Sequence, residues 1–200
     1  MGLLTPWLVA DDGVSLLGAK VELRTPHLRD FTDWRDVRLS SRGFLEQWEP
    51  RWDEADYSRS AFRDRLRQYQ TLSDQDQAFS FFIFGRETGQ FCGAITLSNI
   101  RRGIAQMGTL GYWIGTRFAR QGLMTDAIAT LLAHTFSELG LHRVEAACLP
   151  HNEASIRLLQ KCGFTEEGYA ASYLKIAGRW EDHLLFAKVN GSRVWGNVQP

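Results

Sequence analysis

The chain has no excess charge of either sign, few cysteines and no long apolar run. Lys plus Arg and Asp plus Glu number 23 each, so no overall field favours nucleic acid or a membrane surface. Cys92, Cys148 and Cys162 form neither a CxxC motif nor a Cys/His cluster with zinc spacing. We therefore expect no metal site and no direct contact with nucleic acid. The cysteines are expected to be small core residues in a reducing compartment.

The sequence also lacks targeting and membrane signals. Its first 20 residues have no basic start, and Asp11 and Asp12 interrupt their apolar run, so we expect no signal peptide. No segment approaches the roughly 20 apolar residues that cross a bilayer. These absences favour a cytoplasmic protein without membrane contact.

The order of predicted elements favours one mixed α/β domain over residues 1–200. Alternating and apolar runs predict about seven strands, at residues 20–25, 78–84, 91–97, 106–114, 143–149, 169–176 and 183–189. Amphipathic spacing predicts about four flanking helices, at residues 27–40, 57–72, 123–139 and 153–162. Residues 1–18 are expected to form a loosely packed arm, and residues 190–200 a tail. We find no repeat and no linker.

The turn at 117–122 lies where a strand leads into the N-terminus of a helix. Such a junction presents unpaired backbone N–H groups and the positive end of the helix dipole, which suit a phosphate. Arg117 and Arg120 add positive charge. An ordinary connection with solvent-facing basic residues has the same pattern, so downstream residues must decide.

A second informative segment begins at Asn152. Asn152 is a good N-cap, and Ser155 three residues later can complete a capping exchange. Glu153 in the first turn suits the helix dipole. By itself the segment predicts only a well-started helix that Gly163 ends.

Together, these two segments resemble the GNAT superfamily of N-acetyltransferases. GYWIG followed by RQGLMTDAI resembles the family's acetyl-CoA strand and pyrophosphate loop, and PHNEASIRLLQKCGF resembles its second CoA-binding motif. GFTEEGYAASYLKIAGRWEDHLLFAKV and the upstream LEQWEP are similar to the RimJ-type branch, which acetylates the N-termini of ribosomal proteins. Relatives that acetylate other amines share that tail. The resemblance covers roughly Val21 to Val189 and implies a GNAT fold with acetyl-CoA as co-substrate.

The resemblance also implies roles for individual residues. Backbone groups of Trp113, Ile114 and Arg117 would pair with pantetheine like an added strand, and Asn152 would bond the same arm. The diphosphate would be held by N–H groups of Arg120, Gln121, Gly122, Leu123, Met124 and Thr125. The loop departs from the family pattern at Ala119, where Gln or Arg is usual, and at Met124, where Gly or Ala is usual. Backbone groups do most of the binding in such a loop, so these changes need not abolish it.

The catalytic groups are less clearly marked. Leu159 stands where many family members place a Tyr that protonates the leaving thiolate. Ser155 would lie near the thioester sulfur and is our replacement candidate, although a hydroxyl at a helix start is equally a simple cap. Glu49 is a candidate for attracting the cationic amine, or it merely flanks an aromatic anchor. Glu145 and Asp182 are further acidic candidates for which solvated or ion-paired roles are as common.

We therefore expect an enzyme that moves acetyl from acetyl-CoA to a primary amine by direct attack. An α-amino group has a pKa of about 7.7–8.0, well below the ~10.4 of Lys, so a modest base or ordered water suffices for a protein N-terminus. That acceptor is preferred, with a ribosomal protein as the first candidate. The alternatives are a small amine (a polyamine, an amino acid or an antibiotic) and a CoA-binding protein without catalysis. A wide cleft beside residues 44–52 would favour a peptide, and a closed acidic pocket a polyamine. The sequence fits a monomer or a dimer.

Overall fold

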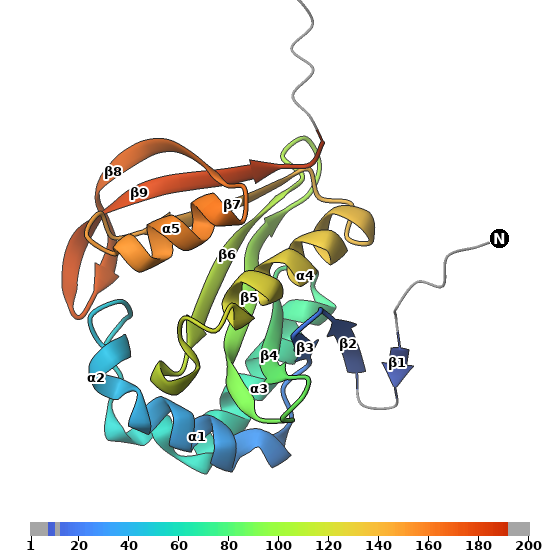
Figure 1. The fold of residues 1–200 in the computed structure, drawn as a ribbon, viewed down its shortest axis with the longest axis vertical. Helices are drawn as coiled ribbons and strands as arrows, with labels where there is room; N and C mark the ends of the chain where they lie inside the picture. The colour runs from blue at the N-terminus through green and yellow to red at the C-terminus, as the bar shows by residue number, and fades with distance from the viewer. Residues whose placement is uncertain (1–7, 11–12, 192–200) are drawn as a thin grey trace, which may run out of the picture.

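A computed structural model describes residues 8–10 and 13–191. Within these residues, nine strands form one sheet in the order β1-β2-β3-β4-β5-β6-β7-β9-β8 (Figure 1). The strands are β1 (Leu8–Ala10), β2 (Gly13–Leu17), β3 (Val21–Arg24), β4 (Phe79–Gly85), β5 (Phe91–Arg101), β6 (Met107–Ile114), β7 (Arg143–Cys148), β8 (Thr165–Ile176) and β9 (Arg179–Val189). Of the pairings between them, only that of β6 with β7 is parallel.

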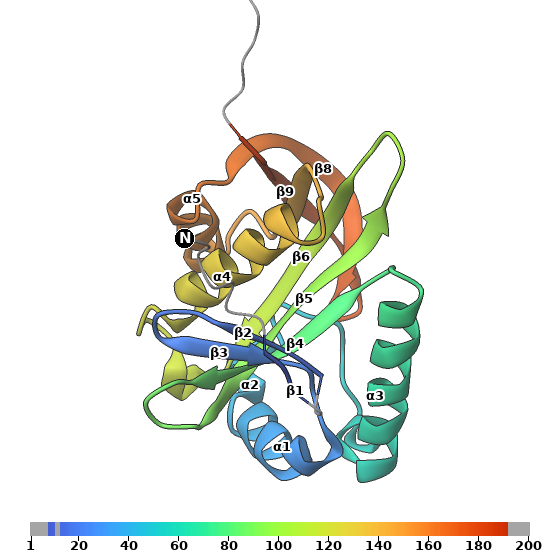
Figure 2. The ribbon, with the colours of Figure 1, turned by 90° about the vertical axis from the view of Figure 1, so that its right-hand side faces the viewer.

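Helices cover both faces of this sheet. They are α1 (Phe31–Ser40), α2 (Arg42–Leu45), α3 (Arg59–Asp74), α4 (Leu123–Ser137) and α5 (Glu153–Lys161), with 3-10 turns η1 (Leu28–Asp30), η2 (Glu54–Tyr57) and η3 (Thr116–Phe118). Figure 2 shows α4 and α5 on one side of the central strands and α3 on the other. The predicted mixed α/β fold is confirmed.

The sheet is larger than predicted at its N-terminal edge. Part of the expected arm forms β2, which pairs antiparallel with β3 through Leu16 opposite Leu23. Leu16 is 1% exposed, so burial of its apolar side chain helps to hold this strand on the sheet. Residues 1–7 and 11–12 of the expected arm, and 192–200 of the expected tail, lie outside the described residues.

Helix α4 packs its predicted apolar face on the sheet. Its buried residues include Ala127, Ile128, Leu131 and Leu132, and each large aliphatic side chain buried contributes about 1.5–3 kcal/mol. Asp126, on the first turn, is fixed in a different way. Its carboxylate accepts hydrogen bonds from the backbone N–H groups of Ala19, Lys20 and Val21, at 3.2, 2.7 and 3.0 Å. The start of β3 is thereby tied to the start of α4.

The parallel strands β6 and β7 separate after a short contact. Their pairing covers Met107 to Thr109 opposite Arg143 to Glu145. Beyond it β6 remains paired with β5 as far as Ile114, and β7 remains paired with β9. The edge of β6 that faces β7 therefore has backbone N–H and C=O groups without a strand partner. Such groups need other partners, and this wedge is where the cavity of the molecule lies.

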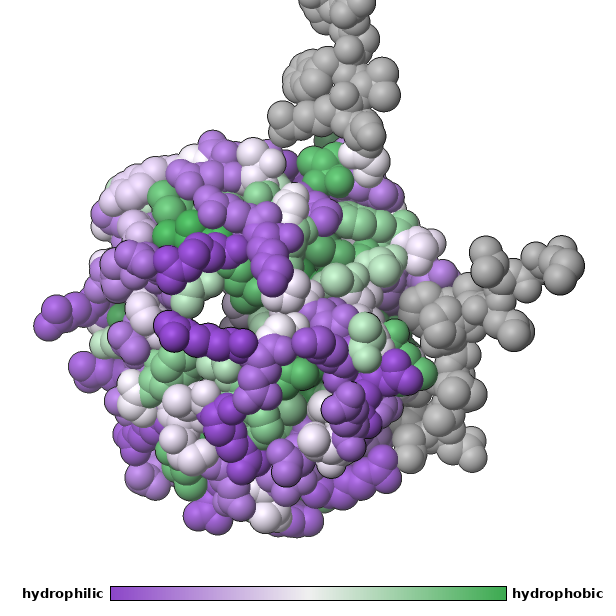
Figure 3. Space-filling model, in the orientation of Figure 1, coloured by the Kyte–Doolittle hydropathy of each residue, from purple (hydrophilic) through white to green (hydrophobic). Residues whose placement is uncertain are grey.

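A second contact closes the far end of the wedge. The backbone N–H of Ala177, in the turn between β8 and β9, donates to the backbone oxygen of Glu49 at 3.0 Å. The Nε of Arg51 donates to the backbone oxygen of Ala177, also at 3.0 Å. These two hydrogen bonds join the segment after α2 to the terminal hairpin. Figure 3 shows an opening through the centre of this face, between the two halves that they connect.

Candidate active site

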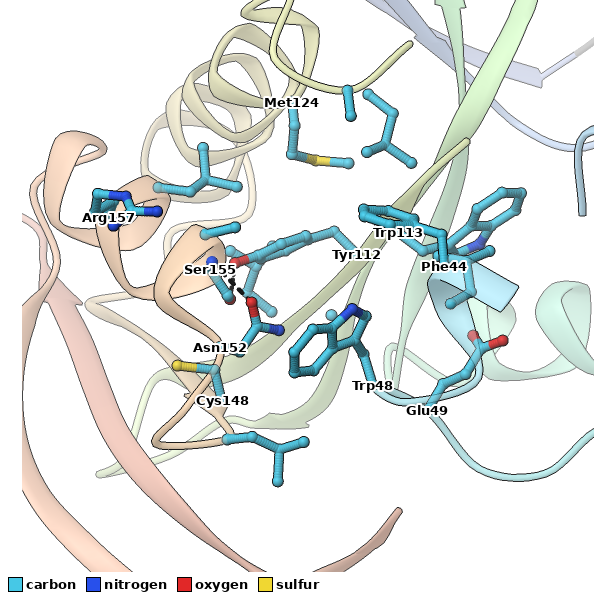
Figure 4. Close-up of a pocket in the computed structure, with 18 of the residues that line it drawn as sticks. Phe44, Trp48, Glu49, Tyr112, Trp113, Met124, Cys148, Asn152, Ser155 and Arg157 are labelled. Atoms are coloured by element: carbon cyan, nitrogen blue, oxygen red, sulfur yellow. Dashed lines mark hydrogen bonds between the residues drawn. The ribbon is translucent and has the colours of Figure 1, made fainter. Parts of the chain in front are cut away.

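A cavity of about 620 Å³ fills the space between β6 and β7. Its walls come from β6, the loop before α4, the start of α5, the segment around α2 and the terminal hairpin. Figure 4 shows side chains from these separate parts of the chain converging on one space. The separation of the strands creates this space, so the fold itself positions the site.

The loop before α4 has the geometry of an anion-binding site. Arg120 and Gly122 both have left-handed backbone conformations, with φ of 62° and 80°. Gly122 is the N-cap of α4, and its carbonyl accepts from the N–H of Asp126 at 3.1 Å. The preceding N–H groups of the first turn have no partner within the helix. Left-handed turns that gather such groups form concave anion sites, and the helix dipole adds to their positive potential.

Most of the residues expected to bind the cofactor line this cavity. They are Trp113, Ile114, Arg120, Gly122, Leu123, Met124, Thr125, Asn152 and Ser155. Arg117 and Gln121 are not part of the lining. The guanidinium of Arg117 lies 4.5 Å from the centre of the Phe118 ring, and Nε2 of Gln121 donates to the backbone oxygen of Arg117 at 2.7 Å.

The phosphate loop also has a neighbouring cation that the sequence did not indicate. The Nζ of Lys20 lies 3.3 Å from the backbone oxygen of Gln121. A Cβ added at Gly122 would lie 3.4 Å from the same nitrogen. Lys20 immediately precedes β3 and is about a hundred residues from the loop, so only the tertiary contact through Asp126 brings it there. No local motif could have identified it.

Asn152 caps α5 as predicted. Its Oδ1 accepts a hydrogen bond from the N–H of Ser155 at 3.1 Å. This contact uses the amide oxygen, and the amide nitrogen has no hydrogen-bond partner among the described side chains and backbone groups. Figure 4 shows the amide beside Ser155 and across from Trp48. Asn152 therefore presents a free donor to the cavity.

Ser155 is joined to a tyrosine that the sequence reading missed. The hydroxyl oxygens of Tyr112 and Ser155 are 2.7 Å apart, and Figure 4 shows them directed toward each other. Burial raises the pKa of Tyr112 well above its usual value, more than the hydrogen bond to Ser155 lowers it. The phenol therefore keeps its proton at neutral pH. Strand alternation places Tyr112 on the face opposite Gly111 and Trp113, but only the position of α5 reveals its partner.

Glu49 lines the cavity with its charge already paired. Its two carboxylate oxygens accept from Nη1 and Nη2 of Arg38 at 2.9 and 2.7 Å. Arg38 is 1% exposed, and its guanidinium also lies 4.0 Å from the ring centre of Trp52. Burial raises the pKa of Glu49, and Arg38 acts in the opposite direction. Because the carboxylate of Glu49 is already paired with Arg38, only part of its charge is available to attract an amine.

The other acidic candidates lie outside the cavity lining. Glu145 accepts from Nε of Arg143 at 2.9 Å. Asp182 accepts from the N–H of Ser172 at 2.7 Å and from the hydroxyl of Tyr169, and these hydrogen bonds hold its pKa below its usual range. Both carboxylates have structural partners.

The three cysteines are buried, as predicted, and Cys148 also borders the cavity. Burial raises the pKa of its thiol, and a protonated thiol is a poor nucleophile. This favours direct attack by the acceptor over an acyl-enzyme. Within residues 8–10 and 13–191, no three His, Cys, Asp or Glu side chains gather to hold a metal ion. No helix of that part of the chain is long and apolar enough to span a bilayer.

Comparison with known proteins agrees with this geometry. Residues 20–165 match the acetyltransferase (GNAT) domain family. The chain is 33% identical over 175 residues to YjcK, a probable N-acetyltransferase of Bacillus subtilis strain 168, covering 88% of this chain and 97% of that protein. It is 35% identical over 174 residues to the ribosomal protein uS5-alanine N-acetyltransferase of Escherichia coli strain K12, covering 87% and 90%. The structure of Mycobacterium smegmatis RimJ in complex with CoA-disulfide superposes with a TM-score of 0.81 and 31% identity, covering 89% of this chain and 83% of that one.

The chain therefore belongs to the GNAT family of acetyltransferases. It is an acetyl-CoA-dependent N-acetyltransferase related to the enzymes that acetylate ribosomal-protein N-termini.

The residues of the cavity fit acetyl-CoA. The unpaired edge of β6 can pair with the amides of an extended pantetheine arm, and the free amide nitrogen of Asn152 adds a donor beside it. The loop at Arg120 and Gly122 offers N–H groups to a diphosphate. If the pantetheine arm runs along β6 toward α5, its thioester end would lie beside Ser155 and Tyr112.

Proposed function

We propose that this enzyme acetylates the N-terminal α-amino group of a protein. The observation that carries the proposal is the shape of the cavity on its acceptor side. Its walls there are Phe44 and Trp48 from the segment around α2, and Leu174, Ile176 and His183 from the terminal hairpin. These side chains form a largely apolar wall, which suits the end of a polypeptide. The similarity to a ribosomal protein uS5-alanine N-acetyltransferase supports the same acceptor class.

The charges beside the cavity argue against a polyamine. Besides the imidazole of His183, the acceptor side has the carboxylate of Glu49, and the adjoining cavity adds the guanidinium groups of Arg38 and Arg65. The single carboxylate is already bound to Arg38. A polyamine would enter this region as a multiple cation without a free counter-charge.

The chain's own residues can carry out the transfer. Acetyl-CoA supplies an activated acetyl group as a thioester. An α-amine is partly deprotonated at neutral pH, since its pKa is about 7.7–8.0. The amine nitrogen forms a bond to the carbonyl carbon as the C–S bond breaks, so the amine loses one proton to water and the sulfur gains one. In this proposal Ser155 Oγ gives the sulfur its proton and recovers one from the Tyr112 hydroxyl 2.7 Å away, and the phenol regains its proton from water.

A panel of peptides that differ in their first residue tests this proposal. Thiol release from acetyl-CoA would be measured for each peptide, for spermidine and for free amino acids. We expect higher kcat/KM for peptides, with a preference among first residues, and alanine is the natural first choice. Equal or faster turnover of the small amines would contradict the proposal. CoA binding without thiol release for any amine would indicate a binding protein.

A further inference from the structure

A second cavity, of about 380 Å³, adjoins the first on the other face of the sheet. The two cavities share Glu49, Gly111, Tyr112 and Trp113 in their walls. Ala94 lies opposite Trp113 in the sheet, and Phe82 lies opposite Ala94, so these three side chains belong to one face. The remaining walls come from α1, the segment at Trp52 and α3. An acceptor whose amine points into the first cavity can place its next residues in the second.

The ionisable groups of this second cavity are mostly satisfied. Arg38 and Glu49 form the bidentate pair described above. Burial raises the pKa of Tyr69, so its phenol is neutral. The exception is Arg65, on α3, which has neither an ion pair nor a hydrogen bond to any described residue. The charged groups in the cavity wall, Arg38, Glu49 and Arg65, therefore sum to one excess positive charge.

Two tryptophans hold the guanidinium of Arg65 in place. Its Cζ lies 4.1 Å from the ring centre of Trp52 and 5.2 Å from that of Trp34. A guanidinium stacked on a ring still has N–H donors in its own plane, arranged as a fork that matches a carboxylate. Burial lowers the pKa of Arg65, the expected effect on a cation that has lost part of its water.

Two carboxylates near Arg65, those of Glu49 and Asp56, favour its charged form, but neither forms an ion pair with it. Glu49 is paired with Arg38, and Oδ2 of Asp56 accepts from the N–H of Asp53 at 2.7 Å. A partly desolvated charge without a counter-ion is costly unless a ligand supplies one. The same geometry would serve a purely structural role if the stack existed only to anchor Trp52. The acceptor preference distinguishes these two roles.

We propose that Arg65 binds a carboxylate on the acceptor, so that the preferred acceptors are peptides with an acidic residue close behind the N-terminus. This inference rests on the proposed function and narrows its substrate class. The amine lies in the first cavity, the chain passes Trp113, and the acidic side chain meets Arg65 in the second cavity. The reaction itself is unchanged, since Arg65 determines specificity and is not a catalytic residue.

The test uses matched peptides and the full-length enzyme. Peptides that begin with alanine carry Glu at position two, three or four, and each has a partner with Gln at the same place. For at least one position we expect kcat/KM to favour Glu about tenfold, as a charge-assisted hydrogen bond would give. The ratio should fall as salt is raised, because salt screens the attraction.

Three substitutions locate the effect. In Arg65→Gln the ratio of kcat/KM for Glu peptides to that for Gln peptides should fall to about one, because the charge-assisted hydrogen bond to the carboxylate is lost. Arg63→Gln removes the same charge from an exposed position on α3 and should leave the ratio unchanged. Arg65→Lys keeps the charge without the fork, so it should retain part of the ratio even if Arg65→Gln folds poorly.

The possible outcomes separate this inference from the proposed function. If peptides are acetylated but kcat/KM is the same for the Glu and Gln peptides at every position, the role of Arg65 is overturned and N-terminal acetylation still stands. A preference for Glu over Gln peptides that persists in Arg65→Gln would also overturn the role of Arg65 alone. Failure to acetylate any peptide would overturn the proposed function and this inference with it.

Discussion

The pair formed by Tyr112 and Ser155 stands where the family pattern left a gap. Leu159, at the position where many relatives place a tyrosine, is fully buried in the core and takes no part in lining the cavity. A phenol is nevertheless present, because β6 supplies Tyr112 and α5 supplies its hydrogen-bond partner. If this pair protonates the thiolate, as proposed above, the phenol comes from a strand and not from a helix, and both residues line the cavity.

Removing either hydroxyl should slow the chemical step. Ser155→Ala should lower kcat by roughly 10–100-fold with little change in CoA affinity, since general acids contribute at least this much. Tyr112→Phe should lower kcat by about tenfold, and the double variant should be no slower than Ser155→Ala, because the two groups act as one unit. Steady-state kinetics and CoA titration measure both effects. Additive losses would show that the hydroxyls act separately, and unchanged kcat in Ser155→Ala would make that residue a helix cap only.

The pH profile should report the acceptor amine and not the phenol. Turnover requires the amine unprotonated, so kcat/KM should rise with pH through about 7.7–8.0 and then level off. Because burial raises the pKa of Tyr112 above its usual value of about 10, its proton stays in place and no descending limb should follow below about pH 9.5. Rates from pH 6 to 9.5 check this. A fall in rate near pH 9 that disappears in Tyr112→Phe would contradict it.

The same residues show how far sequence reasoning could reach. Asn152 and Gly122 were identifiable because capping and turn chemistry are local properties of the chain. Tyr112, Lys20 and Arg65 were not, because their roles depend on partners that only the folded chain brings close. Local sequence identifies where groups of a given chemistry occur. It does not identify which of them meet.

At the scale of elements, every predicted strand and helix overlaps one that is observed, but β5, β8 and β9 are each four residues longer than predicted, and β1 and β2 lie where an arm was expected. The expected helix at 153–162 is α5 (Glu153–Lys161), and the expected strand at 106–114 is β6 (Met107–Ile114). Strong periodicity and clear turns account for this agreement. The wedge between β6 and β7 could not be predicted in this way, since it depends on where two distant strands stop pairing.

A carboxylate in the first turn of α4 holds the start of the neighbouring strand β3. Asp126→Ala removes the acceptor of three backbone N–H groups, those of Ala19, Lys20 and Val21. We expect a loss of about 1–3 kcal/mol in the free energy of unfolding, reduced because water can reach part of this contact. Urea denaturation measures it. Asp126→Asn keeps one acceptor oxygen and should lose less, so equal losses in the two variants would point to packing and not to these hydrogen bonds.

At the scale of the whole molecule, the segment after α2 is joined to the terminal hairpin. Their contact consists of the two hydrogen bonds at Ala177. Arg51→Ala removes one of them at an exposed position, so the global free energy of unfolding should change by less than about 1 kcal/mol. Amide hydrogen exchange near residues 174–180 should become faster, because the turn is held less firmly.

A matched control for this experiment is Arg35→Ala, an exposed arginine on α1. It should leave exchange in the hairpin unchanged. Equal exchange in Arg51→Ala and the parent protein would show that the other hydrogen bond, or packing, is enough to hold the turn.

These two hydrogen bonds close the backbone into a ring around the opening seen in Figure 3. A ring admits the end of a chain directly, whereas an internal segment can enter only with a side chain or by doubling back. Preference for N-termini over internal lysines would then follow from topology as well as from the lower pKa of the α-amine. A peptide with a blocked N-terminus and one internal lysine should remain unmodified even at pH 9.5, and its acetylation at a rate similar to a free N-terminus would rule out such sorting.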